Sequence, residues 1–230
     1  MSSVRGRTRK AEQAAATRAL LVRVARELFG ARGYGRVAID EIAERVGVTT
    51  GALYHHFRDK RELFRAVYEE VERELSEKIA SRIAARARSG SNAWQEVRAG
   101  AQAFLDACQD HDVQRIALLE ARSVLGGDVS HDIALYGLDL IRRGLERARE
   151  QGHIGPQPIE PLAHLLRSAI TEAAMLIARS ADPSAARSEV GAALDRLIDG
   201  LRVAEPRSPA RPRRPTRKKT GHAKYPRRRL

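Results

Sequence analysis

The stretch from Ile39 to Lys60, IDEIAERVGVTTGALYHHFRDK, most tightly constrains what this chain can fold into. Apolar residues recur at helical spacing on both sides of Gly47, and only Gly47, Val48 and Thr49 separate the two periodic segments. Glycine suits a left-handed helix end, and a threonine hydroxyl suits the start of the next helix. The pattern therefore predicts two short helices joined by a tight turn, which is the geometry of a helix–turn–helix.

The rest of the sequence also favours helix. Aromatic residues make up only 4% of the chain, and alanine, leucine, arginine and glutamate, which are good helix formers, are abundant. We expect an all-α protein of about nine helices, with an N-terminal three-helix domain followed by a larger helical domain. The expected helices cover about 17–32, 39–46, 49–57, 60–88, 93–109, 112–123, 130–151, 161–180 and 183–203.

The predicted domain organisation follows from the pattern of charge and apolar spacing. The first ten residues hold four Lys and Arg side chains and residues 206–230 hold eleven, with no acid in either segment. Residues 11–205 hold 27 basic and 29 acidic side chains, so the net charge of +13 belongs to the ends of the chain. We expect a basic disordered arm (1–13), a helix–turn–helix domain (14–75, motif about 38–57), a helical domain (76–204) and a basic disordered tail (205–230).

The basic tail has two interpretations. Its charges would raise non-specific affinity for nucleic acid by releasing counterions, or they would form a solvated extension without a binding role. The single cysteine, Cys108, excludes an internal disulfide framework. The sequence shows neither a signal peptide nor an apolar run long enough to span a membrane, so we expect a soluble cytoplasmic protein without a membrane partner.

The second helix of the predicted motif carries the residue types that a DNA-reading helix needs. Small and hydroxyl residues at its start allow close approach to phosphates and base edges, and helix N-terminal amides favour phosphate. The candidate DNA-binding residues are Thr49, Thr50, Gly51, Ala52, Tyr54, His55, His56 and Lys60. Amphipathic helix pairs are common, so a three-helix subdomain without a nucleic-acid role remains the alternative.

The segment from Gly30 to Phe64, GARGYGRVAIDEIAERVGVTTGALYHHFRDKRELF, resembles the DNA-binding region of the tetracycline-repressor (TetR) family of transcriptional regulators. The resemblance covers about the first third of the chain. It implies a homodimeric, repressor-type protein that binds an operator, which a two-fold dimer would make palindromic, and that responds to a small-molecule effector. Carried over by position, it supports the DNA-binding residues named above and assigns Leu53 and Phe57 to the core.

Two features depart from the family pattern. Val37 and Ala38 stand where the family often has hydroxyl residues, so a helix cap and a phosphate contact are missing, and Arg36 is a possible substitute. The recognition helix also lacks Arg, Gln and Asn, which are the usual bidentate readers of guanine and adenine. Base readout would then depend on threonine contacts, the histidines and DNA shape.

Wide apolar stripes mark the last two predicted helices. Two such helices can pair with their two-fold copy into a four-helix bundle, and DNA half-sites favour a dimer. The candidate dimerisation residues are Leu165, Ile170, Ala173, Ile177, Leu194, Leu197, Ile198 and Leu201. An intramolecular core is the alternative explanation for the same stripes.

The helices between about Leu63 and Gln151 are expected to enclose an effector pocket. The candidate ligand-binding residues are Trp94, Phe104, Cys108, Leu119, Glu120, Arg122, His131 and Tyr136. Each of them is also compatible with a place in the core or on the surface. A ligand that favours one spacing of the two DNA-binding heads would change DNA affinity through linkage, with the long helix near 60–88 as the transmitter.

An enzyme is the main alternative from another class. A di-iron helical bundle needs paired Glu-x-x-His motifs, and the single such spacing, Glu150 to His153, falls in a predicted turn. One cysteine and scattered histidines give neither a zinc site nor a thiol nucleophile. We therefore expect no catalytic residues, no metal and no cofactor. A dimeric ligand-binding or scaffold protein without specific DNA binding is the second alternative.

Overall fold

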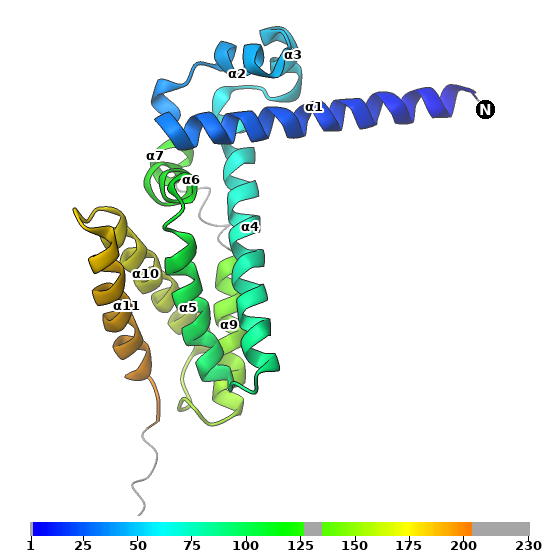
Figure 1. Ribbon diagram of the computed structural model, residues 1–230. Helices are drawn as coiled ribbons and strands as arrows, with labels where there is room; N and C mark the ends of the chain where they lie inside the picture. Colours follow the sequence, from blue (N-terminus) through cyan, green and yellow to red (C-terminus); the bar gives the residue numbers. More distant parts are fainter. Residues whose placement is uncertain (1, 127–134, 204–230) are drawn as a thin grey trace, which may run out of the picture.

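The computed structural model describes residues 2–126 and 135–203, and within these ranges the chain folds into helices without a β-strand. The all-α prediction is confirmed. Figure 1 shows a small cluster formed by α1, α2 and α3 above a bundle of longer helices. The helices are α1 (Ser2–Arg32), α2 (Ile39–Val46), α3 (Thr50–His56), α4 (Lys60–Arg88), α5 (Ala93–Ala107), α6 (His111–Val113), α7 (Ala121–Leu125), α9 (Leu135–Glu150), α10 (Ile159–Ala178) and α11 (Pro183–Asp199).

The head of the molecule, formed by α1, α2, α3 and the start of α4, has a well-packed core. An aromatic cluster of Phe29, Tyr34 and Phe64 lies at its centre, with ring centroids 5.2–5.7 Å apart. Phe29 and Phe64 are fully buried, and Leu53 of α3 and Phe57 after it are buried with them. The core assignment of Leu53 and Phe57 is therefore confirmed.

Local capping signals determine where the head helices begin and end. Gly47 closes α2 in the left-handed region at φ 79°, as the sequence predicts. The Thr49 side chain caps α3 by accepting from the Ala52 amide, and Asp59 caps α4 by accepting from the Glu62 amide. Ala38 occupies the N-cap of α2 and provides no side-chain hydrogen bond, which confirms the missing cap.

The described structure has a helix where the sequence suggests a disordered arm at 1–13, because α1 begins at Ser2. The sequence also suggests Thr17 as the cap of a helix starting there, but its hydroxyl donates to the Gln13 carbonyl oxygen at 3.0 Å, inside the helix. The alanine-rich segment before Thr17 has high helix propensity, and extending an existing helix costs far less than starting one. Residues 10–16 are exposed, and Figure 1 shows this part of α1 projecting beyond the head. The predicted tail at 205–230 lies outside the described residues.

The body consists of α4, α5, α9, α10 and α11, with α5 packed against the other four helices. α4 is one unbroken helix of 29 residues that runs from the head into the body, as the sequence predicts. The break after it contains Gly90 at φ 81°, and Asn92 then caps α5 with a reciprocal hydrogen bond from Gln95. No helix within 2–126 and 135–203 is both long enough and apolar enough to cross a membrane.

The segment from His111 to Leu125 differs from the uniform helix that its sequence predicts near 112–123. Its central part, Gln114–Glu120 (η2), is a π-helix between the short helices α6 and α7. π-Helical turns are rare and occur frequently at functional sites. We call residues 111–125 the connecting segment, because it packs against α1 and α4 of the head and against α10 of the body.

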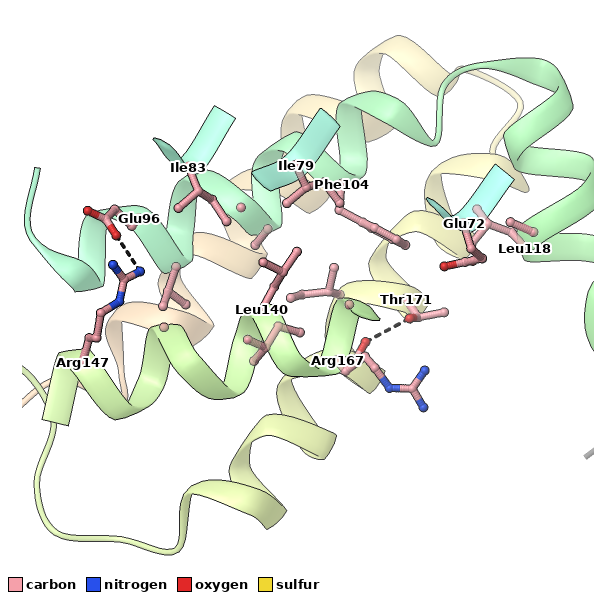
Figure 2. A pocket seen from close by; sticks show the side chains of 18 of the residues that line it. Glu72, Ile79, Ile83, Glu96, Phe104, Leu118, Leu140, Arg147, Arg167 and Thr171 are labelled. Carbon is pink, nitrogen blue, oxygen red and sulfur yellow. Dashed lines mark hydrogen bonds and ion pairs between the residues drawn. The ribbon is translucent and has the colours of Figure 1, made fainter. Parts of the chain in front are cut away.

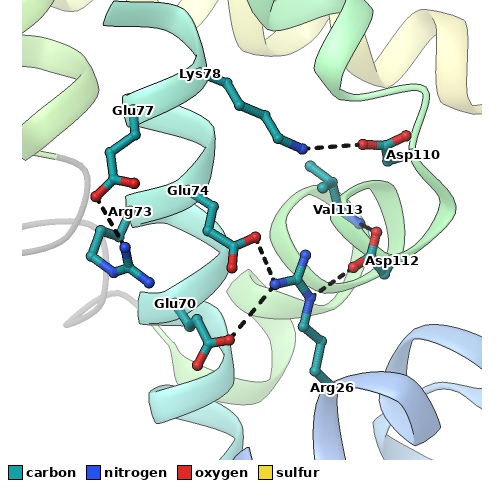
Figure 3. Close-up of polar contacts among 9 residues, drawn as sticks. All are labelled: Arg26, Glu70, Arg73, Glu74, Glu77, Lys78, Asp110, Asp112 and Val113. Carbon is teal, nitrogen blue, oxygen red and sulfur yellow. Dashed lines mark hydrogen bonds and ion pairs between the residues drawn. The ribbon is translucent and has the colours of Figure 1, made fainter. Parts of the chain in front are cut away.

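Polar contacts hold the connecting segment to the head. Arg26 of α1 binds Asp112 at 2.8 Å and Glu74 of α4 at 2.7 Å, so one guanidinium joins three helices (Figure 3). Burial alone would raise the pKa of Asp112, but the hydrogen bond and charge of Arg26 outweigh burial, and the pKa lies below its usual range. This network is partly buried and fixes α6 against α1 and α4.

Candidate DNA-binding surface and ligand cavity

The start of α3 presents small groups to solvent, but its two threonine hydroxyls are already engaged. The Thr49 Oγ1 accepts from the Ala52 amide at 3.1 Å, and the Thr50 Oγ1 donates to Asp40 at 2.7 Å. Gly51 is exposed, and a Cβ built there would meet only Thr49 Oγ1, at 4.0 Å. The N-terminal end of α3 is therefore a smooth surface that a phosphate backbone or a base edge can approach closely.

The polar side chains of α3 face outward. Tyr54 is 49% exposed, His55 is exposed, and His56 is partly buried beside it with ring centroids 6.0 Å apart. Lys60 opens α4 with its ammonium 4.2 Å from the centroid of the Tyr34 ring. Partial burial lowers the pKa of Lys60, and the charge of Glu120 acts in the opposite direction.

The entry to α2 explains the departure from the family pattern in physical terms. Val37 is 1% exposed and belongs to the core of the head, so it replaces a polar contact with packing. Ala38 and Arg36 are exposed on either side of it. The exposed Arg36 lies two residues before Ala38, the N-cap residue of α2.

A cavity of about 160 Å³ lies in the body between α4, α5, η2, α9 and α10. Its walls are mostly aliphatic, with Phe104 as an aromatic residue among them (Figure 2). Two residues of the connecting segment, Ala117 and Leu118, form part of its wall. The cavity is therefore in direct contact with the segment that also touches the head.

Polar groups lie at both ends of this cavity. At one end, Glu96 is 4% exposed and forms an ion pair with Arg147 at 2.8 Å. At the other end are Glu72 of α4 and Arg167 of α10 (Figure 2). Burial raises the pKa of Glu72 to about 7, although the Tyr68 hydroxyl and the Arg167 charge act to lower it.

Most of the predicted ligand-binding residues lie away from the cavity. Phe104 lines it, whereas Trp94 is buried and donates to Asp199 at 3.3 Å, and Cys108 is buried where the charge of Glu72 acts on it. Leu119 and Arg122 are exposed on the connecting segment. His131 lies outside the described residues; Tyr136 belongs to α9, but its side chain lies outside what the structure describes.

Glu120 has a different position from the predicted one. Its carboxylate accepts from the Tyr34 backbone amide at 2.7 Å, at the junction between α1 and α2. Gly33 precedes this amide at φ 84°, and a Cβ there would lie 2.5 Å from Glu120 Oε1. Glu120 therefore fixes the connecting segment to the head, and glycine is needed for the close approach.

Sequence reasoning missed the polar end of the cavity, although a signal is present. Glu72 falls on the same helical face as Tyr68, Leu75 and Ile79, because these positions recur at three- and four-residue spacing. Arg167 likewise interrupts the apolar face of α10. A charged residue inside an apolar stripe marks either a buried ion pair or a polar group in a cavity.

The apolar stripes of α10 and α11 divide into an inward and an outward set. Leu165 is 69% exposed and Leu197 is 57% exposed, and Leu176, which the prediction omits, is 53% exposed. Leu201 is partly buried. The other five predicted dimerisation residues are buried within the chain itself, namely Ile170, Ala173, Ile177, Leu194 and Ile198. The intramolecular core alone accounts for the burial of this second set.

Comparison with known proteins gives consistent matches over the head and the body. Residues 21–67 match the family model described as bacterial regulatory proteins, tetR family, and residues 94–201 match that of the tetracyclin repressor-like C-terminal domain. The Transposon Tn10 TetC protein of Escherichia coli is 30% identical over 50% of this chain and 56% of its own length. The HTH-type transcriptional activator FasR of Mycolicibacterium smegmatis is 36% identical over 44% of each chain.

These curated relatives match over about half of their length, whereas one solved structure matches almost completely. A TetR-family transcriptional regulator from Pectobacterium atrosepticum is 33% identical, with a TM-score of 0.74, and the match covers 84% of this chain and 97% of that one. The similarity therefore extends over both the head and the body. The chain belongs to the TetR family of transcriptional regulators.

Proposed function

We propose that this protein is a homodimeric, effector-responsive repressor that binds operator DNA through α3 in the cytoplasm. The observation that carries the proposal is the position of the connecting segment. Ala117 and Leu118 line the cavity, and Asp112, Glu120 and Leu125 of the same segment bind the head. A ligand that moves one side of this segment changes the position of the other, which couples ligand binding to DNA binding.

The DNA contact itself is assigned to the exposed groups at the start of α3 and α4. Thr49, Thr50, Gly51 and Ala52 give backbone amides and small side chains for close approach, while Tyr54, His55 and His56 reach base edges or sugars. Lys60 would leave its place over the Tyr34 ring to bind a phosphate, or would hold that phosphate from there. The DNA-binding region of this proposal is 14–75 and the ligand-binding and dimerisation region is 76–204, with α4 crossing between them.

The two-fold dimer is assigned to α10 and α11. Leu165 and Leu176 lie eleven residues apart, so they share one face of α10, and Leu197 gives α11 an exposed apolar side chain. Exposed leucines at this density on neighbouring helices favour burial against a second copy. A Leu165→Glu and Leu197→Glu double variant is expected to be monomeric by light scattering, whereas Ala84→Glu on the exposed face of α4 is expected to remain dimeric.

DNA binding is tested by fluorescence anisotropy with a duplex from the region upstream of the gene, at several salt concentrations. Tyr54→Ala and Lys60→Ala are expected to weaken binding at least tenfold, and Arg88→Ala, at the far end of α4, is expected to leave it unchanged. Equal binding by all variants, or none by the wild-type chain, would favour the scaffold alternative. Because FasR is a named activator, a reporter assay with and without the protein decides the direction of regulation.

A further inference from the structure

The cavity in the body has two polar ends that differ in how well their charges are paired. Figure 2 shows Glu96 and Arg147 at one end, and Glu72, Arg167 and Thr171 at the other. Aliphatic side chains, such as Ile79, separate the two ends. A bound ligand is oriented by polar side chains that are not already paired with each other, so the ion pairing at each end determines which ligand groups can bind there.

The Glu96 end is occupied by its own ion pair. Glu96 is 4% exposed, and its Oε2 forms an ion pair with Arg147 of α9 at 2.8 Å without accepting a hydrogen bond of good geometry within the described residues. The Arg147 side chain is 48% exposed, so only the Glu96 carboxylate is buried, and a ligand that displaced Arg147 would leave that carboxylate without its cation. A ligand at this end would therefore compete with an existing ion pair.

The Glu72 end has capacity for new hydrogen bonds. The Nε of Arg167 is buried and has no hydrogen-bond acceptor among residues 2–126 and 135–203. The Thr171 hydroxyl donates to the Arg167 carbonyl oxygen at 2.9 Å, which leaves its oxygen as an acceptor. The Glu72 carboxyl is close enough for the Arg167 charge to act on its pKa. One permanent donor and one carboxyl acceptor thus lie at the same end.

The charges at this end disfavour a charged ligand. A carboxylate ligand would pair with Arg167 but meet the Glu72 carboxyl, and an ammonium ligand would pair with Glu72 but meet Arg167. A neutral hydroxyl satisfies both, because it donates one hydrogen bond and accepts another. The residues facing Glu72 from other helices, Cys108 after α5 and Arg167 of α10, supply no second negative charge at neutral pH.

The size of the cavity limits the body of the ligand. An apolar protein cavity of about 150 Å³ holds a benzene molecule. The volume here is about 160 Å³, so one six-membered ring with a single small substituent fills it. The aliphatic walls and Phe104 match an apolar ring.

We propose that the cavity takes a neutral single-ring alcohol or phenol whose ring lies against Phe104 and the aliphatic wall. Its hydroxyl donates to Glu72 and accepts from the Arg167 Nε–H. This inference rests on the proposed effector response, since it names the class of effector for the same cavity. Glu72 and Arg167 are the residues that select the hydroxyl, and the ring is selected by volume.

The test is isothermal titration calorimetry on the full chain with probes matched in size: phenol, toluene, benzoate and benzylamine. Phenol is expected to bind about tenfold or more tightly than toluene, because hydroxyl and methyl are similar in size and two buried hydrogen bonds distinguish them. Benzoate and benzylamine are expected to bind more weakly than phenol. Glu72→Met and Arg167→Met should each reduce the phenol preference, whereas Glu69→Met, exposed on α4, and Arg179→Met, exposed at the C-cap of α10, should preserve it.

Four outcomes overturn the assignment: equal affinity for phenol and toluene, tightest binding of a charged probe, a phenol preference that survives both pocket variants, or no binding of any probe up to millimolar concentration. If Glu72→Met fails to fold, as thermal unfolding would reveal, the wild-type ratio and Arg167→Met still decide the question. Selective phenol binding without any change in DNA affinity would uphold the ligand class and contradict the effector response.

Discussion

The head and the cavity differ in how they are built from the chain. The head is contiguous in sequence, from Leu21 to Phe64, and its helix ends are fixed by local caps and by Gly47. The cavity is formed by residues from five helical elements that are far apart in sequence, and each of its two ends is lined by charged side chains. A contiguous, capped unit allows residue-by-residue inference from sequence. For a cavity assembled from distant helices, the sequence shows only which face of each helix is apolar and which is polar.

The two regions also differ in packing. Phe64 is fully buried in the aromatic cluster of the head, whereas Phe104 is partly buried and borders the cavity. Phe64→Ala is expected to lower the free energy of unfolding by about 3–5 kcal/mol. Phe104→Ala is expected to cost less, since its ring already lacks neighbours on the cavity side. Chemical denaturation of both variants measures the difference, and equal losses would contradict the contrast.

Glu72 makes the cavity pH-sensitive in a way that the head is not. Burial raises its pKa to about 7, so the folded protein keeps a proton that the unfolded chain releases, and stability falls as pH rises from about 4.5 to about 7. The full effect is at most about 3 kcal/mol. The free energy of unfolding of Glu72→Gln should therefore increase relative to that of wild type as pH rises from 4.5 to 8.

The measurement is urea denaturation of both proteins across this pH range. The exposed Glu69→Gln on the same helix serves as the control and should show a constant difference from wild type. A pH-independent difference for Glu72→Gln would mean that the carboxyl is ionised and solvated in the folded state.

The Arg26 network tests the junction between the two regions. Arg26→Met leaves Asp112 and Glu74 partly buried without their cation, and we expect a loss of about 1–3 kcal/mol at pH 7. The pKa of Asp112 lies below its usual range, so the stabilisation is present above about pH 4 and disappears as pH falls through the lower folded-state pKa. Thermal unfolding at pH 7 and at pH 3 should show the loss shrinking, and an undiminished loss at pH 3 would exclude this ion pair as its cause.

Two cap variants probe the head at the smallest scale. Thr49→Ala removes the hydroxyl that accepts from the Ala52 amide and should cost about 1 kcal/mol. Ala38→Ser supplies the hydroxyl that the N-cap of α2 lacks and should add up to about 1 kcal/mol. Circular dichroism melts of both variants check the signs. A neutral Ala38→Ser would show that the extended backbone at this position does not aim the hydroxyl at the free amides.

Most of the head could be predicted from the sequence, because its signals are local. Gly47, Thr49 and Asp59 each act within four residues, and the resemblance to the TetR family assigns Leu53 and Phe57 to the core, where both are buried. The N-terminal extension of α1 was missed since charge and polarity predict disorder as readily as an exposed helix. The DNA contacts, the dimer contacts and the effector contacts remain predictions.

The cavity could not be located from the sequence, because helical periodicity shows that a face is buried without showing what it meets. Ile170 and Ile198 face the chain's own core, although the same stripe would serve a dimer. Glu120 looks like a pocket anchor in the sequence, but its carboxylate binds a backbone amide of the head. A helix face that packs inside its own chain and one that packs against a second copy have the same sequence pattern.

The π-helix at Gln114–Glu120 has a consequence for how the chain can vary in length. A π-helical turn holds more residues than an α-helical turn, so it corresponds to an insertion within the helical path. Deleting one residue there would restore α-helical register and rotate everything after it by about 100°. Glu120 would then turn away from Tyr34, and Ala117 and Leu118 could not both stay on the cavity wall. The connecting segment therefore tolerates changes of side chain more readily than a change in its number of residues.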